Sequence, residues 1–187
     1  MEAFVTSTLV VALAEIGDKT QLLSLLLAAR YKRPLPIIAG IFVATLANHF
    51  VAGALGAWIS SFFSPQGLRW IVGGSLLAIA AWTLKRDKFD GEVKASTRFG
   101  LFALTCVVFF LAEIGDKTQI ATIVLAAKFP SLIAVVLGTT FGMMLANVPA
   151  VLIGHRLAEK LPLHLMRWTA AALFFLTGVL TLVFAPA

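Results

Sequence analysis

Charged residues are scarce in this sequence. Only 13% of its 187 residues are charged and 60% are hydrophobic, whereas a soluble domain carries about 25% charged residues. The single cysteine, Cys106, excludes an intramolecular disulfide and any cysteine-based zinc site. Nucleotide-binding loops, catalytic-triad motifs and metalloprotease histidine motifs are also absent. The composition therefore predicts an integral membrane protein, long enough for about six spans of about 20 residues.

Six apolar segments follow one another along the chain. They cover residues 3–29, 36–59, 68–84, 99–127, 131–154 and 165–184. None shows the alternation of a β-barrel strand, and all are too long for ordinary strands. The predicted fold class is therefore an all-α integral membrane protein with six transmembrane helices. The first segment lacks a basic leader, so we do not expect it to be a signal peptide.

Basic residues are divided unevenly between the two predicted sides of the membrane. Links 1–2, 3–4 and 5–6 contain Arg30, Lys32, Arg33, Lys85, Arg86, Lys88, Lys94, Arg98, Arg156, Lys160 and Arg167, and the opposite side contains Arg69 and Lys128. The positive-inside rule places the richer side in the cytoplasm, so both termini should face outward. Because these residues flank spans, they do not indicate a nucleic-acid partner. The predicted location is the inner membrane of a bacterium.

The sequence LAEIGDKTQ occurs twice, at residues 13–21 and 111–119. Nine identical residues at a fixed offset indicate an internal duplication. We expect two three-helix repeats, residues 1–84 and 99–187, joined by a charged cytoplasmic linker at residues 85–98. Because each repeat has an odd number of spans, the second should cross the membrane in the opposite direction, as in transporters built from inverted repeats.

Four acidic residues lie inside the predicted spans: Glu15, Asp18, Glu113 and Asp116. Each charge near the middle of a bilayer costs about 2.5–3.5 kcal/mol if nothing compensates it. These side chains are therefore expected to meet each other, water or an ion. Two-fold symmetry would bring both pairs of acids to one central site.

Helical spacing gives further expectations for the first motif. Glu15 and Asp18 are three residues apart and are expected to face the same direction, while Glu15 and Lys19 are four apart and are expected to pair along the helix. Gly17, like Gly115 in the second motif, weakens the helix, and an unwound turn there would free carbonyl oxygens for a cation.

Neutral polar residues surround the acids and lysines of both motifs. They are Thr20, Gln21, Thr118, Gln119, Asn48 and Asn147, with Lys19 and Lys117 as charge partners. Together with four carboxylates they predict a hard oxygen site that suits Ca²⁺, Mn²⁺ or Mg²⁺ better than Zn²⁺ or Cu⁺. A purely structural alternative remains, in which the Glu–Lys pairs are internal salt bridges.

The formal charge of this site suggests a hypothesis for transport. Four carboxylates and two ammonium groups sum to −2, which one divalent cation or two protons would neutralise. The roles of three neighbours stay open. His49 has no counterpart in the second repeat and is either a proton relay or a buried structural histidine. Met143 and Met144 lie within a turn of Asn147 and are either core residues or thioether ligands.

With both Glu-Ile-Gly-Asp-Lys-Thr motifs complete, at residues 15–20 and 113–118, the chain resembles the small cation-exchanger family with paired Glu-x-Gly-Asp-Lys/Arg-Thr/Ser motifs. That family includes bacterial manganese exporters and the Golgi and chloroplast Ca²⁺/Mn²⁺ transporters. The resemblance covers nearly the whole chain. It implies divalent cation/proton antiport with the motif acids as the ion site and no cofactor. It favours Mn²⁺ efflux, with Ca²⁺/H⁺ antiport as the alternative.

Three other classes of protein fit the sequence less well. An intramembrane aspartyl hydrolase could use Asp18 and Asp116, but it leaves the paired glutamates and lysines without a task. Export of an organic solute fits poorly with four acids. A membrane scaffold leaves the buried charges unexplained. The sequence therefore predicts a secondary active transporter, not an enzyme, whose partners are the lipid bilayer, a divalent metal ion and protons.

Overall fold

The computed structural model describes residues 1–84, 100–153 and 163–184, and helices make up nearly all of these ranges. The helices are α1 (Glu2–Glu15), α2 (Lys19–Tyr31), α3 (Pro34–Ser60), α4 (Pro65–Thr83), α5 (Leu101–Glu113), α6 (Lys117–Lys128), α7 (Leu132–Ile153) and α9 (Leu163–Phe184). The described ranges contain no strand, so the all-α prediction is confirmed there. The predicted linker at residues 85–98, Arg156 and Lys160 lie outside the described residues.

The helix boundaries follow local chain chemistry. Pro34 and Pro65 open α3 and α4, where a missing N–H costs nothing because the first turn has no acceptor for it. Ser64 caps α4, its hydroxyl accepting a hydrogen bond from the Gly67 N–H at 3.2 Å. At the other end of a helix, Lys32 closes α2 in a left-handed conformation, with φ 53°.

Two of the six predicted spans are each divided into two shorter helices. The segment from 3 to 29 forms α1 and α2, and the segment from 99 to 127 forms α5 and α6. Taken singly, two described helices have the length and hydropathy to cross a membrane, within Pro34–Ser60 and Leu132–Leu152. The half-length helices fail such a test because each motif interrupts an apolar run.

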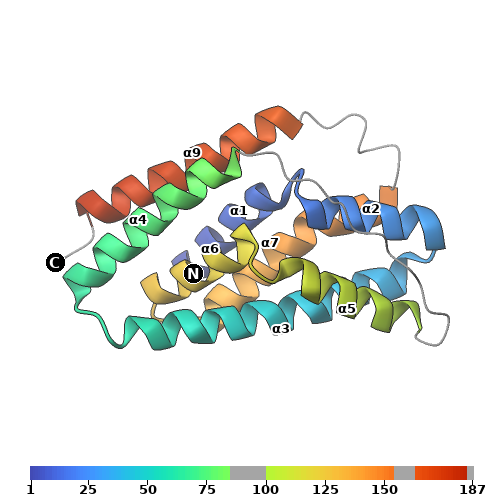
Figure 1. Cartoon of the computed structure of the whole chain (residues 1–187), viewed down its shortest axis with the longest axis horizontal. Helices are drawn as coiled ribbons and strands as arrows, with labels where there is room; N and C mark the ends of the chain where they lie inside the picture. Colours follow the sequence, from blue (N-terminus) through green and yellow to red (C-terminus); the bar gives the residue numbers. More distant parts are fainter. Residues whose placement is uncertain (85–99, 154–162, 185–187) are drawn as a thin grey trace.

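The helices pack as an elongated bundle (Figure 1). Helices α4 and α9 lie side by side along one flank, and α3 runs along the opposite edge. Helix α1 packs mainly on α7, and α5 packs mainly on α3. Each half of the chain therefore places its first helix against the long helix of the other half, so the two halves are interlocked.

A close approach of backbones fixes the contact between α3 and α5. A Cβ added to Gly40 would lie 2.6 Å from the Thr105 Cβ and 2.9 Å from the Phe102 carbonyl oxygen. No side chain fits in that space, so only glycine lets these two helices approach so closely.

The same contact recurs between α7 and α1. A Cβ on Gly138 would lie 2.6 Å from the Phe4 carbonyl oxygen and 3.0 Å from the Ser7 Cβ. All three residues stand 98 positions from their counterparts in the α3–α5 contact. The offset of the sequence repeat is therefore also the offset of equivalent helix crossings.

Two apolar clusters form the interior. One contains Leu76, Leu125 and Phe174, and the other contains Leu23 and Phe109. The first cluster is built mainly from α1, α4, α6 and α9, and the second mainly from α2, α3 and α5. The repeated motifs join α1 to α2 and α5 to α6, so they lie where the two clusters meet.

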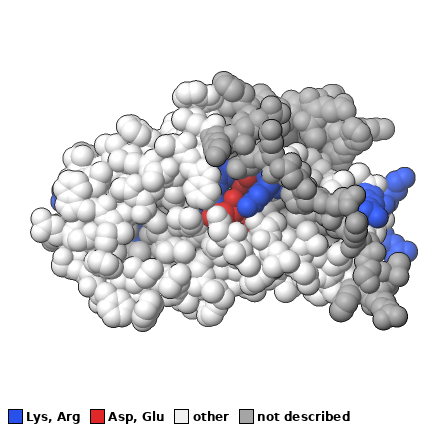
Figure 2. Space-filling model, viewed as in Figure 1, with Lys and Arg blue, Asp and Glu red and all other residues white. Residues whose placement is uncertain are grey.

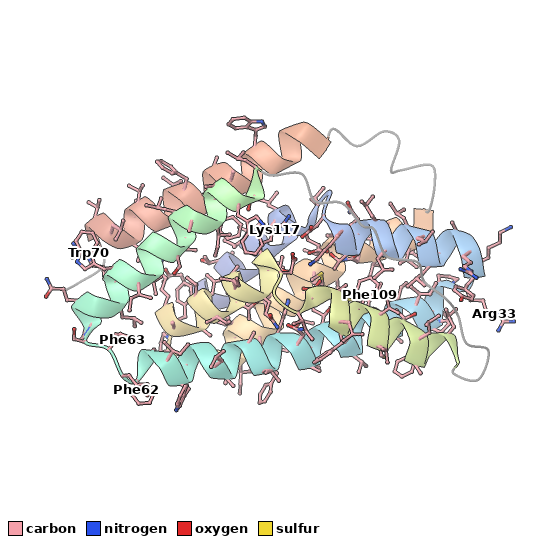
Figure 3. All side chains as sticks on the ribbon, viewed as in Figure 1. Arg33, Phe62, Phe63, Trp70, Phe109 and Lys117 are labelled. Carbon is pink, nitrogen blue, oxygen red and sulfur yellow. The ribbon has the colours of Figure 1, made fainter. Side chains whose placement is uncertain are left out.

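The two ends of the bundle differ in charge. Arg33 lies at one end, while Phe62, Phe63 and Trp70 lie at the other, and Lys117 lies inside (Figure 3). Most of the visible Lys and Arg atoms gather at the Arg33 end (Figure 2). Both features are typical of a protein whose ends face different sides of a membrane.

The glycine contact at the α7–α1 crossing predicts a specific loss of stability. Replacing Gly138 with alanine forces two backbones apart, which overpacking data put at about 1–3 kcal/mol. Gly74→Ala is the matched control, because a Cβ there meets nothing within 4 Å. Thermal unfolding in detergent should show a lower midpoint for G138A and little change for G74A. Equal midpoints for the two variants would contradict this packing.

Candidate metal centre

Each motif breaks its helix at the glycine. Helix α1 ends at Glu15 and α2 begins at Lys19, while α5 ends at Glu113 and α6 begins at Lys117. Gly17 has φ 80° and Gly115 has φ 72°, a left-handed conformation that costs an L-residue roughly 1–2 kcal/mol. The breaks expected at both glycines are present in the structure.

The glutamine that ends each motif holds the break in shape. The Gly17 N–H donates to Gln21 Oε1 at 2.8 Å, and the Gly115 N–H donates to Gln119 Oε1, also at 2.8 Å. Each bond satisfies a backbone donor that the broken helix would otherwise leave unpaired. The sequence predicted these glutamines only as candidate metal ligands. Their spacing gives no sign of a hydrogen bond to the glycine N–H.

Three of the four predicted acids converge. One carboxylate oxygen from each of Glu15, Glu113 and Asp116 lies within 4.8 Å of the other two, and all three residues are buried. The oxygens Glu15 Oε2 and Glu113 Oε1 have no hydrogen-bond partner among the described residues. Buried carboxylate oxygens are rarely left in this condition, because desolvation without a partner is costly.

Asp18, the fourth predicted acid, is not among these three and has other contacts. It follows the break and caps α2, where its Oδ1 accepts a hydrogen bond from the Lys19 N–H at 2.7 Å. Its Oδ2 lies 3.1 Å from Lys117 Nζ. Because Gly17 turns the chain, Glu15 and Asp18 no longer share one helical face.

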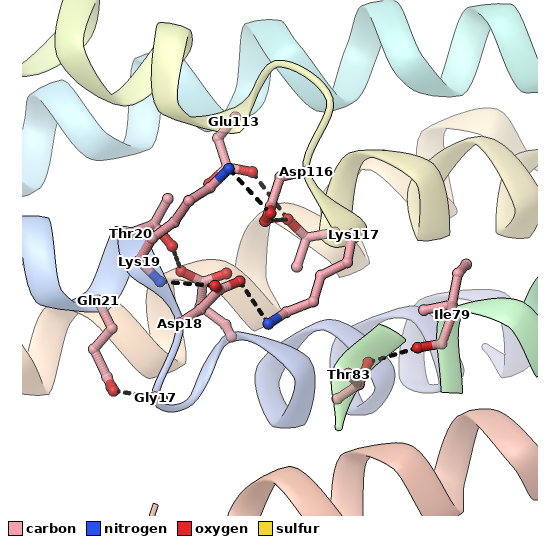
Figure 4. A network of polar contacts seen from close by, with 12 residues as sticks. Gly17, Asp18, Lys19, Thr20, Gln21, Ile79, Thr83, Glu113, Asp116 and Lys117 are labelled. Atoms are coloured by element: carbon pink, nitrogen blue, oxygen red, sulfur yellow. Dashed lines mark hydrogen bonds and ion pairs between the residues drawn. The ribbon is translucent and has the colours of Figure 1, made fainter. Parts of the chain in front are cut away.

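The lysines pair across the two motifs (Figure 4). Lys19 Nζ lies 3.1 Å from Asp116 Oδ1, and Lys117 Nζ lies 3.1 Å from Asp18 Oδ2. The expected pairing of Glu15 with Lys19 is therefore wrong, because it assumed a continuous helix through Gly17. The observed ion pairs join one half of the chain to the other.

The two ion pairs differ in exposure. The side chain of Lys19 is 25% exposed, whereas that of Lys117 is 2% exposed. In Figure 2 acidic atoms and an adjacent basic side chain are visible from outside, near the middle of the molecule. The centre is therefore deeply placed, yet one side of it reaches the surface.

Both motif threonines bind the glutamate of their own motif. The Thr20 hydroxyl donates to Glu15 Oε1, and the Thr118 hydroxyl donates to Glu113 Oε2 at 2.9 Å. The Thr118 oxygen also lies 3.2 Å from Asp116 Oδ2. The threonines therefore orient the carboxylates, and the opposite glutamate oxygens have no partner among the described residues.

Of the four predicted amides, one binds an acid of the trio directly. Asn147 Nδ2 donates to Glu15 Oε1 at 3.2 Å, and Gln119 Nε2 donates to Asn48 Oδ1 at 2.8 Å. Gln21 Nε2 instead donates to the Ala146 carbonyl at 3.1 Å. The two halves therefore use equivalent residues in different hydrogen bonds.

Two residues whose roles the sequence left open lie beside these amides. Met143 is fully buried, and its Sδ lies 3.1 Å from Asn147 Nδ2, so the thioether is a near neighbour of Glu15. His49 is also buried, and neither ring nitrogen has a hydrogen-bond partner among the described residues. Met144 packs against the apolar cluster around Phe109.

The chemistry of the centre follows from its donor set. Three carboxylates, with hydroxyl and amide groups behind them, offer hard oxygen ligands of the kind that divalent Ca²⁺, Mn²⁺ and Mg²⁺ prefer. Two lysines supply fixed positive charge to the same centre. The arrangement can exchange a metal ion for protons, because carboxylates accept either.

Comparison with known families bears directly on this chemistry. The family described as "Divalent cation/proton antiporter GDT1" matches residues 3–91 and 101–187. The chain belongs to this family. It is therefore a divalent cation/proton antiporter and a membrane protein, as the paired motifs predicted, and the predicted transporter class is confirmed over the enzyme alternative.

Relatives of this GDT1-family chain occur in distant organisms. A Vibrio cholerae protein named "Putative manganese exporter" is 54% identical over 98% of this chain and 92% of its own length. GDT1-like protein 5 of Arabidopsis thaliana is 27% identical over 97% of this chain and 96% of its own. GDT1-like protein sll0615 of Synechocystis is 28% identical over 97% of both chains. No solved structure matches the chain.

The unequal burial of the two crossed ion pairs predicts that their removal lowers the stability of the protein by different amounts. Lys117→Met removes one partner of a pair in which both groups are buried, a change that typically costs about 3–5 kcal/mol. Lys19→Met is the matched control, because its side chain reaches solvent and water replaces part of the lost interaction. Thermal unfolding of both variants in detergent should show the larger loss for K117M. A larger loss for K19M would contradict the assigned environments.

Proposed function

We propose that this protein exports Mn²⁺ from the bacterial cytoplasm in exchange for protons, and that Glu15, Glu113 and Asp116 bind the ion. The observation that carries this proposal is the convergence of these three buried carboxylates within 4.8 Å. Two of their oxygens lack a partner among the described residues, and a bound cation would supply one. Asp18 and the lysines set the charge of the site from its border.

Charge balance supports an exchange of one metal ion for two protons. The four motif carboxylates and two lysine ammonium groups sum to −2. One divalent cation restores neutrality, and two protons on the carboxylates do the same when the cation leaves. A site that is neutral in both loaded forms avoids moving a net charge through the low-dielectric interior.

An inverted repeat is part of the proposal. The two repeats are residues 1–84 and 99–187, each crossing the membrane three times, with residues 85–98 in the cytoplasm and both termini outside. Support comes from the equivalent glycine crossings of α3 with α5 and of α7 with α1. The concentration of basic residues at one end of the bundle supports the same orientation.

The unequal packing of α4 and α9 supports alternating access. Helix α4 packs on α6, and α9 packs on α1, whereas α4 with α5 and α9 with α2 share at most marginal contact. In the proposed orientation α1 and α6 form the outer halves of the broken spans, so the outer side is closed and the cytoplasmic side is looser. Mirror-image packing of the repeats would reverse this.

The choice of Mn²⁺ over Ca²⁺ has two supports. The Vibrio cholerae relative named as a manganese exporter is 54% identical, and the buried Met143 thioether lies beside the amide that holds Glu15. Sulfur ligands favour transition metals, and Ca²⁺ takes oxygen ligands only. Ca²⁺/H⁺ antiport is the alternative, since the trio itself consists of oxygen ligands.

Transport in proteoliposomes tests the main proposal. With an imposed pH gradient, the protein should move Mn²⁺ and dissipate the gradient, and Glu113→Gln should reduce this flux at least about 100-fold because it removes one charged ligand and a proton acceptor. Ca²⁺ and Mg²⁺ are measured separately. Full proton-coupled Mn²⁺ flux in E113Q would refute the assigned site, and absence of flux for all three ions would refute the proposed function.

Selectivity provides an independent prediction. Met143→Leu keeps the volume of the side chain but removes the sulfur, so the preference for Mn²⁺ over Ca²⁺ should fall by about tenfold, equivalent to about 1.4 kcal/mol. Met144→Leu is the control, since Met144 packs in the apolar cluster. The measurement is competition between the two ions in the same vesicles. Unchanged selectivity in M143L would show that the Met143 thioether does not contribute to the preference for Mn²⁺.

A further inference from the structure

The amides around the acid trio break the symmetry of the repeat. Asn147 donates to Glu15 Oε1, but its counterpart Asn48 accepts from Gln119 instead. Gln21, the counterpart of Gln119, donates past Asn147 to the Ala146 carbonyl. Equivalent side chains therefore occupy two alternative hydrogen-bond patterns in one structure.

The atoms left over by this pattern are informative. Asn48 Nδ2, Glu113 Oε1 and Asn147 Oδ1 are buried and have no hydrogen-bond partner among the described residues. Each unpaired buried polar atom of this kind destabilises a protein by an amount similar to a lost hydrogen bond. Glu15 Oε2 is unpaired in the same way as Glu113 Oε1, so the two asparagine atoms are the ones that point to a second pattern in which they are paired.

Exchanging the two patterns between the halves supplies the missing partners. If the first half adopts the pattern of the second, Asn48 Nδ2 donates to Glu113 as Asn147 now donates to Glu15. Gln21 then donates to Asn147 Oδ1, as Gln119 now donates to Asn48. Asn48 Nδ2 and Asn147 Oδ1 acquire partners in this way, without any new residue entering the site.

We infer that Asn48 and Asn147 are positioning residues that exchange hydrogen-bond partners between the two access states of the antiporter. In the observed state Asn147 orients Glu15, while Asn48 binds Gln119 and not Glu113; in the opposite state Asn48 orients Glu113 and Asn147 releases Glu15. The exchange makes the glutamates unequal in each state and couples their orientation to the packing of α3 and α7. This inference rests on the proposed alternating access of inverted repeats.

Two matched substitutions separate the states. Asn48→Asp deletes an Nδ2 that is unpaired here but needed in the opposite state, so N48D should favour the observed state. Asn147→Asp deletes an Nδ2 that binds Glu15 and Met143 here but keeps the oxygen used in the opposite state, so N147D should favour that state. Both add the same negative charge at equivalent positions.

The distance between α4 and α5 reports the state directly. These helices are apart in the observed packing, and mirror exchange would bring them together as it separates α1 from α9. Spin labels are placed on Trp82→Cys and Val107→Cys, two exposed positions, in the full chain with Cys106→Ala. Pulsed electron paramagnetic resonance in metal-free lipid nanodiscs then gives the populations of long and short distances.

The expected result is a shift in opposite directions. Relative to the parent protein, N48D should raise the ratio of long to short distances and N147D should lower it, each about fivefold, the change expected for one buried hydrogen bond. The double variant should return the ratio toward the parent value. A shift of both single variants in the same direction, or of neither, would overturn the inference, because a general charge or folding effect acts alike on both.

Failure of the two proposals is distinguishable. If N147D does not fold, N48D alone still has to shift the ratio toward long distances, and no shift overturns the exchange. The distances are measured without metal. If the two variants shift the distances in opposite directions but the protein does not move Mn²⁺, the amide exchange stands and only the proposed cargo is refuted. If the protein moves Mn²⁺ but the distances do not shift, the proposed function stands and the amide exchange is refuted.

Discussion

Burial of charge inside an apolar bundle is the constraint on which the rest of this structure depends. Five of the six ionisable motif side chains are almost fully buried, and each would be costly alone. The backbone breaks at Gly17 and Gly115 turn these side chains toward one another. The glutamine clamps, the threonine hydroxyls and the crossed lysines all compensate for placing charges there. The close helix crossings at Gly40 and Gly138 hold the two halves in the positions that these contacts require.

The two halves of the structure also differ from each other, although their motifs are identical in sequence. The duplicated sequence could have produced two identical half-sites, yet three acids converge and Asp18 remains at the border with Lys117. Helix α4 packs on α6, and α9 packs on α1. A transporter built from equal halves has to be unequal at any moment, because one side of the membrane must be closed to the ion while the other is accessible.

The sequence was sufficient for the helical class and the transporter family, because its apolar composition and its exact repeat leave few alternatives. It was not sufficient for the partners. Helical spacing paired Glu15 with Lys19, but the positive φ of Gly17 removes the helix that this rule assumes. The crossed pairing with Asp116 depends on a contact between halves almost 100 residues apart, which no local rule encodes. The inequality of Asn48 and Asn147 could not be predicted from the Leu-Ala-Asn that both share, because their partners Gln119 and Glu15 lie in the other half of the chain.

The crossed ion pairs also have a consequence for how the chain is made. Asp18 receives its partner Lys117 only after roughly another hundred residues have been synthesised. Until then Asp18 has only contacts within its own half, such as the Lys19 N–H, and a charge without its counter-ion is costly in an apolar environment. The same crossing means that neither half alone contains both members of an observed lysine–aspartate pair. Because the repeated motifs stand in one chain, these charge pairs form within one molecule and do not depend on protein concentration.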